Sequence, residues 1–151
     1  MTVSASGCAR AWNGEVAIPW LACMMSVSAF YGLPPRVLPA IQAVEGGQVG
    51  TISRNQDGSE DLGPMQVNTL WIGPLARRSG LAEAEVRERL INDACFNIAA
   101  AGAILHMHLR EQNGNLMRAV GNYHSRTPDR HEAYAARVMA AAARLFGRGG
   151  R

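Results

Sequence analysis

The fold of this chain is constrained most by one long helical segment, residues 93–112. Small and apolar residues recur in it at the three- and four-residue spacing of one helix face: Cys95, Ile98, Gly102, Leu105 and Leu109. Asp93 is suited to cap the first turn, and Asn113 with Gly114 ends the segment. The apolar face of this helix needs other elements to cover it, and Gly102 favours the close approach of one of them.

Most of the remaining chain is also predicted to be helical. Alanine runs, few aromatic residues and few β-branched residues favour helix over sheet. Glycine, proline and polar residues separate helical segments at residues 19–31, 36–45, 65–70, 81–90, 115–120 and 127–146. Residues 46–62 form a polar loop that is long for a compact domain, which indicates a functional loop. The sequence therefore predicts an all-α fold with one long loop.

The length and the charge of the chain limit its class. With 151 residues it fits a single domain with a real core, and no repeat or linker divides it. All 15 basic residues are arginine, which we interpret as a coding bias, and the net charge of +3 suits an anionic partner such as the bacterial cell wall or nucleic acid. Because the arginines are spread along the chain rather than clustered on a recognition helix, we expect no nucleic-acid partner.

One acidic residue, Glu45, stands where an apolar helical run ends. It follows Leu38, Ile41 and Val44 at helical spacing and directly precedes Gly46. The C-terminal end of a helix carries partial negative charge, which disfavours an ionised carboxylate nearby, and partial burial acts in the same direction. A raised pKa would suit Glu45 to work as a general acid near neutral pH. By itself, however, a glutamate at a helix end is an ordinary surface residue.

Three further short motifs follow Glu45 along the chain. The four motifs are Glu45-Gly46, Gly63-Pro64-Met65-Gln66, Asn97-Ile98 with Gly102, and Asn122-Tyr123-His124. In this order and spacing they resemble the motifs of the lytic transglycosylases with a goose-lysozyme-like (SLT-type) catalytic domain. The resemblance covers residues 20–142 and points to the small single-domain branch associated with type III and type IV secretion, conjugation and pilus systems.

This resemblance implies a lysozyme-like, all-α single domain that cleaves the glycan strands of peptidoglycan. In such an enzyme one glutamate, here Glu45, protonates the oxygen between N-acetylmuramic acid and N-acetylglucosamine and then acts as a base. The muramyl 6-hydroxyl attacks in place of water, so the product is a 1,6-anhydromuramyl end. The resemblance also implies local cell-wall remodelling for an envelope-spanning machine, with components of that machine as partners. We expect no cofactor, no metal and no transmembrane segment, and a monomer.

The resemblance suggests roles for individual motif residues. Tyr123 corresponds to a tyrosine whose hydroxyl orients the catalytic glutamate, and Asn97 corresponds to a support of the catalytic region. The residues expected at the substrate are Gly63, Met65, Gln66, Asn97 and Asn122. Simpler interpretations remain, because Tyr123 and Met65 also suit a core and Asn97 also suits a helix surface.

Three positions depart from the family pattern. Gly46 replaces a common serine, Pro64 replaces a leucine and stiffens the loop, and His124 replaces an asparagine. None of these changes removes a group with a proton-transfer role. We therefore expect them to affect substrate choice or rate.

Two of the three cysteines match positions that this family branch often joins by a disulfide. Cys23 lies in the first predicted helix and Cys95 lies two residues after Asp93, whereas Cys8 would be a leftover thiol. The bond would stabilise the fold by about 4 kcal/mol in the chain-entropy model, and it implies an oxidising compartment. The alternative is a pair of buried thiols. We expect a periplasmic or otherwise exported protein, although the sequence carries no clean signal peptide.

The chain is expected to divide into three parts. Residues 1–15 form an N-terminal extension, either disordered or the remnant of a leader, and residues 16–146 form the catalytic domain. Residues 147–151 form a flexible tail.

Two other functions on the same fold stay open. A hydrolytic lysozyme would use Asp57 or Asp61 to position a water molecule, although both aspartates also suit a loop that is folded by its own side chains. A non-catalytic assembly factor would bind peptidoglycan in the same groove without cleaving it.

Metal chemistry finds no support in the sequence. The polar loop resembles the start of a calcium-binding loop, but Pro64 stands where that pattern requires a glutamate. His106 and His108 are two positions apart on one predicted helix, so they point to different faces.

Overall fold

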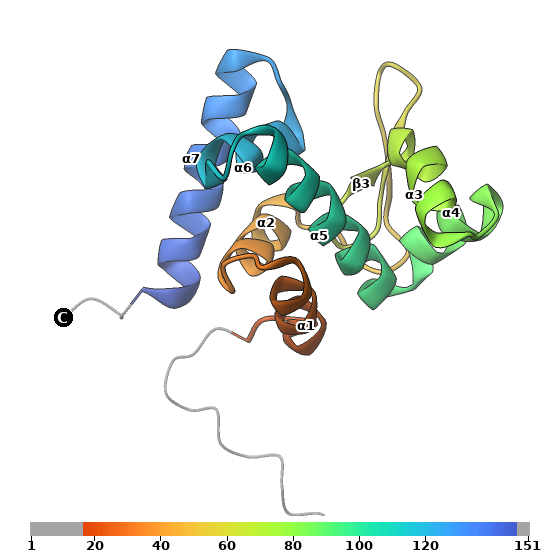
Figure 1. Cartoon of the computed structure of the whole chain (residues 1–151), viewed down its shortest axis with the longest axis horizontal. Coiled ribbons are helices and arrows are strands. Elements are labelled where there is room, and N and C mark those ends of the chain that lie inside the picture. Colours follow the sequence, from red (N-terminus) through yellow and green to blue (C-terminus); the bar gives the residue numbers. More distant parts are fainter. Residues whose placement is uncertain (1–16, 148–151) are drawn as a thin grey trace, which may run out of the picture.

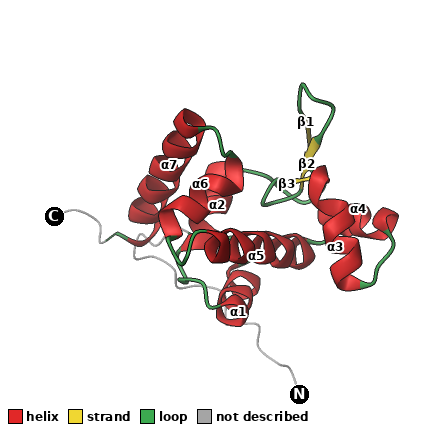
Figure 2. Cartoon of the chain, turned by 45° about the horizontal axis from the view of Figure 1, so that its top comes forward, coloured by secondary structure: helices red, strands yellow, loops and turns green. Residues whose placement is uncertain are grey.

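The computed structural model describes residues 17–147, and its central element is the long helix α5 (Ala94–Glu111). Figure 1 shows α5 crossing the middle of the molecule, with α1 (Leu21–Tyr31) packed against it. Figure 2 shows two groups of elements, one on each side of α5: one is made of helices and the other includes a small sheet. The first group contains α2 (Val37–Glu45), α6 (Leu116–His124) and α7 (Pro128–Phe146). The second contains α3 (Ile72–Ser79), α4 (Glu83–Asn92) and the strands.

Helix α5 begins as its sequence predicts. The Asp93 carboxylate accepts a hydrogen bond from the Phe96 backbone N–H at 3.0 Å, which satisfies one of the free donors of the first turn. Ile98, Ala101 and Leu105 are fully buried on the face that the periodicity indicated. The helix therefore supplies the scaffold on which the other elements pack.

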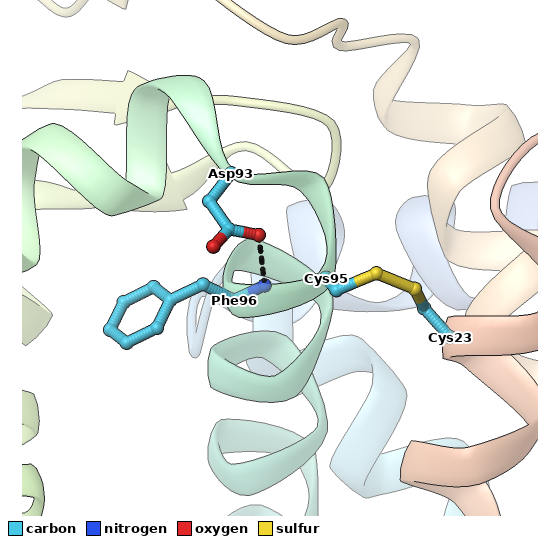
Figure 3. Close-up of a disulfide and its surroundings, with 4 residues drawn as sticks. All are labelled: Cys23, Asp93, Cys95 and Phe96. Atoms are coloured by element: carbon cyan, nitrogen blue, oxygen red, sulfur yellow. Dashed lines mark hydrogen bonds between the residues drawn. A yellow bond between two sulfur atoms is a disulfide. The ribbon is translucent and has the colours of Figure 1, made fainter.

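Gly102 allows α1 and α5 to approach closely, as expected. A Cβ atom at this position would overlap Cγ1 of Val27 and would lie 3.3 Å from Cδ2 of Tyr31. The predicted disulfide between Cys23 and Cys95 is also present and joins the same two helices (Figure 3). The bond spans 72 positions of sequence, and the Cα atoms of the two cysteines are 5.5 Å apart. The start of α5 is thus fixed to α1 by a covalent bond as well as by packing.

The polar segment at residues 46–62 differs from the predicted loop, because it contains part of a sheet. Strands β1 (Ile52–Arg54), β2 (Glu60–Leu62) and β3 (Val67–Asn68) form an antiparallel sheet in the order β1-β2-β3. Ile52 pairs with Leu62, and Asp61 pairs with Asn68. Polar side chains close the hairpin as predicted: the Asp57 carboxylate accepts from both the N–H and the hydroxyl of Ser59, at 2.9 and 2.6 Å.

The short helix predicted at residues 65–70 is wrong. Gln66 has a positive φ of 52°, which stops a helix at this point, and the chain enters β3 and then the 3-10 turn η1 (Thr69–Trp71). The Asn68 side chain caps this turn by accepting from the Leu70 N–H at 2.9 Å. By contrast, α6 continues beyond the predicted residues 115–120 and carries Asn122, Tyr123 and His124 on its last turn. Helix α3 lies in a region where no helix was predicted. As predicted, the structure is mostly helical, with this small sheet added.

Several sequence expectations lie outside the described residues. They are the N-terminal extension at residues 1–15, the thiol of Cys8, and residues 148–151 of the tail.

Helix α1 begins at Leu21, two positions after the predicted start, because Trp20 has a positive φ of 56°.

No single helix within residues 17–147 is both long enough and apolar enough to cross a membrane. The pair α4 and α5 meets that standard only when taken together, and the two are bent by 109° at their junction.

The contact at Gly102 provides a test of the packing between α1 and α5. We expect Gly102→Ala to lower the free energy of unfolding by about 1–3 kcal/mol, because the new methyl group overlaps the stiff side chain of Val27. Gly73→Ala in α3 is the matched control, since its Cβ would lie 3.5 Å or more from its neighbours, and it should leave stability unchanged or raise it slightly. Urea unfolding measures both; equal effects would contradict the close approach.

Candidate active site

A cleft of about 670 Å³ runs between the sheet and the last turns of α6. One wall comes from the hairpin and its following turn, and it includes Asp57, Asp61, Gln66, Asn68 and Trp71. The other wall comes from α6 and the start of α7, and it includes Asn122, Tyr123, His124, Arg126 and Arg130. Glu45, Ile104 and His108 also line the cleft. The cleft is thus built by segments that are up to about 85 residues apart in sequence.

Glu45 reaches this cleft because it is the last residue of α2. Gly46 follows with a positive φ of 68° and returns its N–H to the Gln42 carbonyl at 2.8 Å, which ends the helix. This left-handed conformation favours glycine, which stands here where the family pattern has serine. The half-buried Glu45 side chain accepts a hydrogen bond from the Tyr134 hydroxyl through Oε1 at 2.7 Å.

Burial raises the pKa of the Glu45 carboxyl above its ordinary value. The negative charge of Asp61 raises this pKa further, whereas the Tyr134 hydrogen bond and the Arg137 guanidinium lower it. The direction agrees with the sequence expectation, but burial, rather than the end of the helix, is its main cause. The site therefore favours a carboxyl group that keeps its proton to a higher pH than a free glutamate.

The tyrosine in contact with Glu45 is not the one that the sequence indicated. Tyr123 donates its hydroxyl to the Met65 carbonyl oxygen at 2.8 Å, whereas Tyr134 on α7 donates to Glu45. Tyr123 and Glu45 both line the cleft. Burial raises the pKa of the Tyr123 hydroxyl, and the negative charge of Glu45 adds to this effect. In the sequence Tyr134 belongs to the apolar stripe of the last helix, so its pattern predicts a core residue. Nothing local marks its hydroxyl.

Asn97 is completely buried and holds the turn that precedes β3. Its Oδ1 accepts from the Met65 N–H at 2.8 Å, and its Nδ2 donates to the carbonyl oxygens of Leu62 and Leu90 at 2.7 and 2.9 Å. Gly63 lies so close that a Cβ there would collide with the Asn97 amide. This amide thus connects α5 to the sheet and to the end of α4.

These contacts correct the predicted substrate-binding set. Met65 and Asn97 have no exposed surface and Gly63 is buried, so the three residues position the turn and do not line the cleft. Gln66 and Asn122 do line it. The Gln66 side chain donates to the Gly63 carbonyl at 3.0 Å, which supports its strained backbone from within the turn.

His124 packs directly on the tyrosine that contacts Glu45. The His124 and Tyr134 rings are stacked, with centroids 4.7 Å apart and planes at 10°. Burial lowers the pKa of the His124 imidazole, and the positive charge of Arg137 adds to this effect. Because His124 stands where the family pattern has asparagine, a largely neutral aromatic ring packs against Tyr134.

Asp57 and Asp61, the candidates for positioning water, both line the cleft but also fold the hairpin. Asp61 accepts from Asn55 at 3.1 Å and from Asn68 at 2.9 Å. Across the part of the chain that the structure describes, no three His, Cys, Asp or Glu side chains are grouped to hold a metal ion.

The helical domain, with a half-buried glutamate in its cleft, belongs to the lysozyme-like class. The model of the transglycosylase SLT domain matches residues 23–143, so the chain belongs to this family, whose members are lytic transglycosylases acting on peptidoglycan. The chain is similar to the invasion protein IagB of Salmonella typhimurium strains SL1344 and LT2, and of Salmonella typhi. In each case 28% of 117 residues are identical, over 77% of this chain and 69% of the relative.

The Asn97 network should control stability strongly. We expect Asn97→Ala to lower the free energy of unfolding by about 3 kcal/mol, because it leaves the backbone groups of Leu62, Met65 and Leu90 buried without partners. Asn92→Ala is the control, since Asn92 is exposed and bonds only to Glu88 among the described side chains, and it should cost less than about 0.5 kcal/mol. Denaturant unfolding compares the two; similar losses would contradict this role of Asn97.

The raised pKa of Glu45 predicts a pH-dependent gain in stability from Glu45→Gln. A carboxyl whose pKa is higher in the folded state stabilises the protein below about pH 4.5, and this contribution is lost as the pH rises through the folded value. The free energy of unfolding of Glu45→Gln minus that of wild type should therefore be larger at pH 7.5 than at pH 4, as measured by urea unfolding. Glu132→Gln controls for the loss of one negative charge from an exposed position on α7. A stability difference that does not change with pH would contradict the assignment.

Proposed function

We propose that this protein is a lytic transglycosylase that cleaves the β-1,4 linkage between N-acetylmuramic acid and N-acetylglucosamine and forms a 1,6-anhydromuramyl product. The observation that carries the proposal is the Glu45 carboxyl, which lies in the cleft of an SLT-family domain with a pKa raised by burial. A protonated carboxyl near neutral pH is what the cleavage of a glycosidic bond requires of a general acid.

In the proposed reaction Glu45 acts twice. Its proton passes to the bridging oxygen as the bond from that oxygen to the muramyl C1 breaks, and the N-acetyl oxygen of the same sugar stabilises C1. The carboxylate then takes the proton of the muramyl 6-hydroxyl as this oxygen bonds to C1. The proton returns to Glu45 and no water is consumed. Tyr134 supports both steps by fixing the carboxylate through its 2.7 Å hydrogen bond.

A hydrolytic reaction is the second candidate, and one observation favours it. Asp61 lines the same cleft, and its charge acts on Glu45, so that a second carboxylate stands near the proposed acid. Against this, Asp61 is already bonded to Asn55 and Asn68 in the hairpin. A groove that binds peptidoglycan without cleaving it is the remaining alternative, and the experiment below distinguishes all three.

We also propose that the protein acts outside the cytoplasm, in local remodelling of the cell wall for an envelope-spanning machine. The disulfide between Cys23 and Cys95 is consistent with an oxidising compartment. The association with such a machine is carried over from the family branch that the motifs resemble, and the similar protein IagB is named an invasion protein. Components of a secretion, conjugation or pilus apparatus are the partners this proposal implies.

The test is mass spectrometry of the muropeptides that are released from purified peptidoglycan. Wild type should release 1,6-anhydromuramyl ends, and Glu45→Gln should release at least about 100-fold less while retaining its fold. Glu132→Gln should release as much as wild type, because this residue is exposed on α7. Reducing ends, heavier by one water, would identify a hydrolase instead. Absence of any product from wild type, with binding retained, would identify the non-catalytic alternative.

A further inference from the structure

The proposed reaction assigns no role to a buried histidine that lines the cleft. His108 lies on α5, one turn after Ile104, and only 3% of its surface is exposed, although both residues line the cleft. A histidine that is buried to this extent needs partners for both ring nitrogens.

One of its nitrogens has a partner. Nδ1 lies 3.4 Å from Oε2 of Glu111, and the same oxygen accepts from the Arg126 guanidinium at 2.8 Å. Because a carboxylate can only accept, this contact places the proton of a neutral imidazole on Nδ1. Burial lowers the pKa of His108, and this effect outweighs the opposite effect of Glu111, so that the ring is neutral at neutral pH. Nε2 is then left with a free lone pair.

The other nitrogen opens to the cleft. Among residues 17–147 no hydrogen bond involves Nε2 of His108. An unbonded Nε2 that was fully buried would count among the buried polar atoms without a partner. In this part of the chain those atoms are Ser28 Oγ and His106 Nδ1, so Nε2 of His108 is not fully buried. The small exposed part of His108, which lines the cleft, therefore includes the Nε2 acceptor.

An aromatic surface stands beside this acceptor. The Trp71 and His108 rings meet edge to face, with centroids 5.9 Å apart, and Trp71 also lines the cleft. The neighbouring Leu70 is 75% exposed on the same wall. An apolar aromatic face next to a fixed hydrogen-bond acceptor suits a sugar, which combines C–H faces with O–H and N–H donors.

We propose that His108 is a specificity-determining residue, which accepts a hydrogen bond at Nε2 from an N–H or O–H donor of an N-acetylhexosamine unit that lies against Trp71. This inference rests on the proposed function, because it takes the glycan strand as the ligand of the cleft. Glu111 and Arg126 act through His108 by fixing which nitrogen holds the proton. They are therefore positioning residues.

The test measures binding rather than cleavage. Soluble peptide-free glycan strands are titrated into the Glu45→Gln protein by calorimetry, and further changes are added to this background. His108→Phe, which removes the acceptor, should weaken binding about fivefold to tenfold. His108→Gln, whose amide oxygen can accept, should remain within about twofold of the parent. His106→Phe is the matched control, because His106 packs on Tyr31 of α1 and is not among the residues that line the cleft.

Glu111→Ala separates recognition from a structural role. Glu111 is a surface residue with a 40% exposed side chain, so its change should leave the fold intact even if His108→Phe does not fold. The change removes the acceptor that holds the proton on Nδ1, so the proton can move to Nε2, which converts the acceptor into a donor. We expect binding to weaken about threefold or more, and an NMR measurement of the His108 ring nitrogens should show the change of tautomer.

Strands without acetyl groups identify the donor on the sugar. If the donor is the acetamido N–H, de-N-acetylated strands should bind the parent and His108→Phe equally; if it is a hydroxyl, the difference should persist. The proposal is overturned if His108→Phe and Glu111→Ala both bind intact strands as tightly as the parent. Muropeptide release by wild type, measured separately, shows whether the proposed function holds in that case. A parent that binds no strands also overturns the inference about His108, and the muropeptides released by wild type again decide the proposed function separately.

Discussion

The site depends first on the buried amide of Asn97. Its three hydrogen bonds join α5 to the end of β2, to the turn at Met65 and to the end of α4. Tyr123 then donates to the carbonyl of the same Met65, which brings α6 against the turn from the other side of the cleft. The backbone N–H and the carbonyl oxygen of Met65 are thus both hydrogen-bonded, and the sheet wall of the cleft is fixed relative to α5 and α6. The disulfide at Cys95 fixes the same end of α5 to α1.

The second wall is set by a contact between α2 and α7. Tyr134 holds the Glu45 carboxyl, and His124 stacks on Tyr134, so that one aromatic pair connects the last turn of α6 to the acid. This environment has opposing effects on the proton of Glu45. Burial and Asp61 favour its retention, whereas Tyr134 and Arg137 favour its release. A group that must both give and take a proton in one reaction needs such a balance rather than an extreme pKa.

Local patterns predicted most of the helices well, because helix starts, ends and periodicity are properties of neighbouring residues. The cap at Asp93, the close approach at Gly102 and the end of α2 at Glu45 are examples. The sheet was missed because its strands have only two or three residues each, too few for a period to appear. The helix predicted at residues 65–70 was wrong because tertiary bonds from Asn97 hold the turn in which Gln66 takes a positive φ.

The sequence by itself therefore determined the mostly helical class, the place of Glu45 at a helix end and the motifs that mark the family, and the resemblance to that family indicated the disulfide pair. Only the tertiary structure decided which side chains meet at the cleft. It brought Tyr134, rather than Tyr123, into contact with Glu45, and it buried Gly63, Met65 and Asn97 in supporting positions. It also placed His108 in the lining of the cleft. The physical reason is that burial and hydrogen bonding between distant segments are set by packing, on which the spacing of neighbouring residues carries no information.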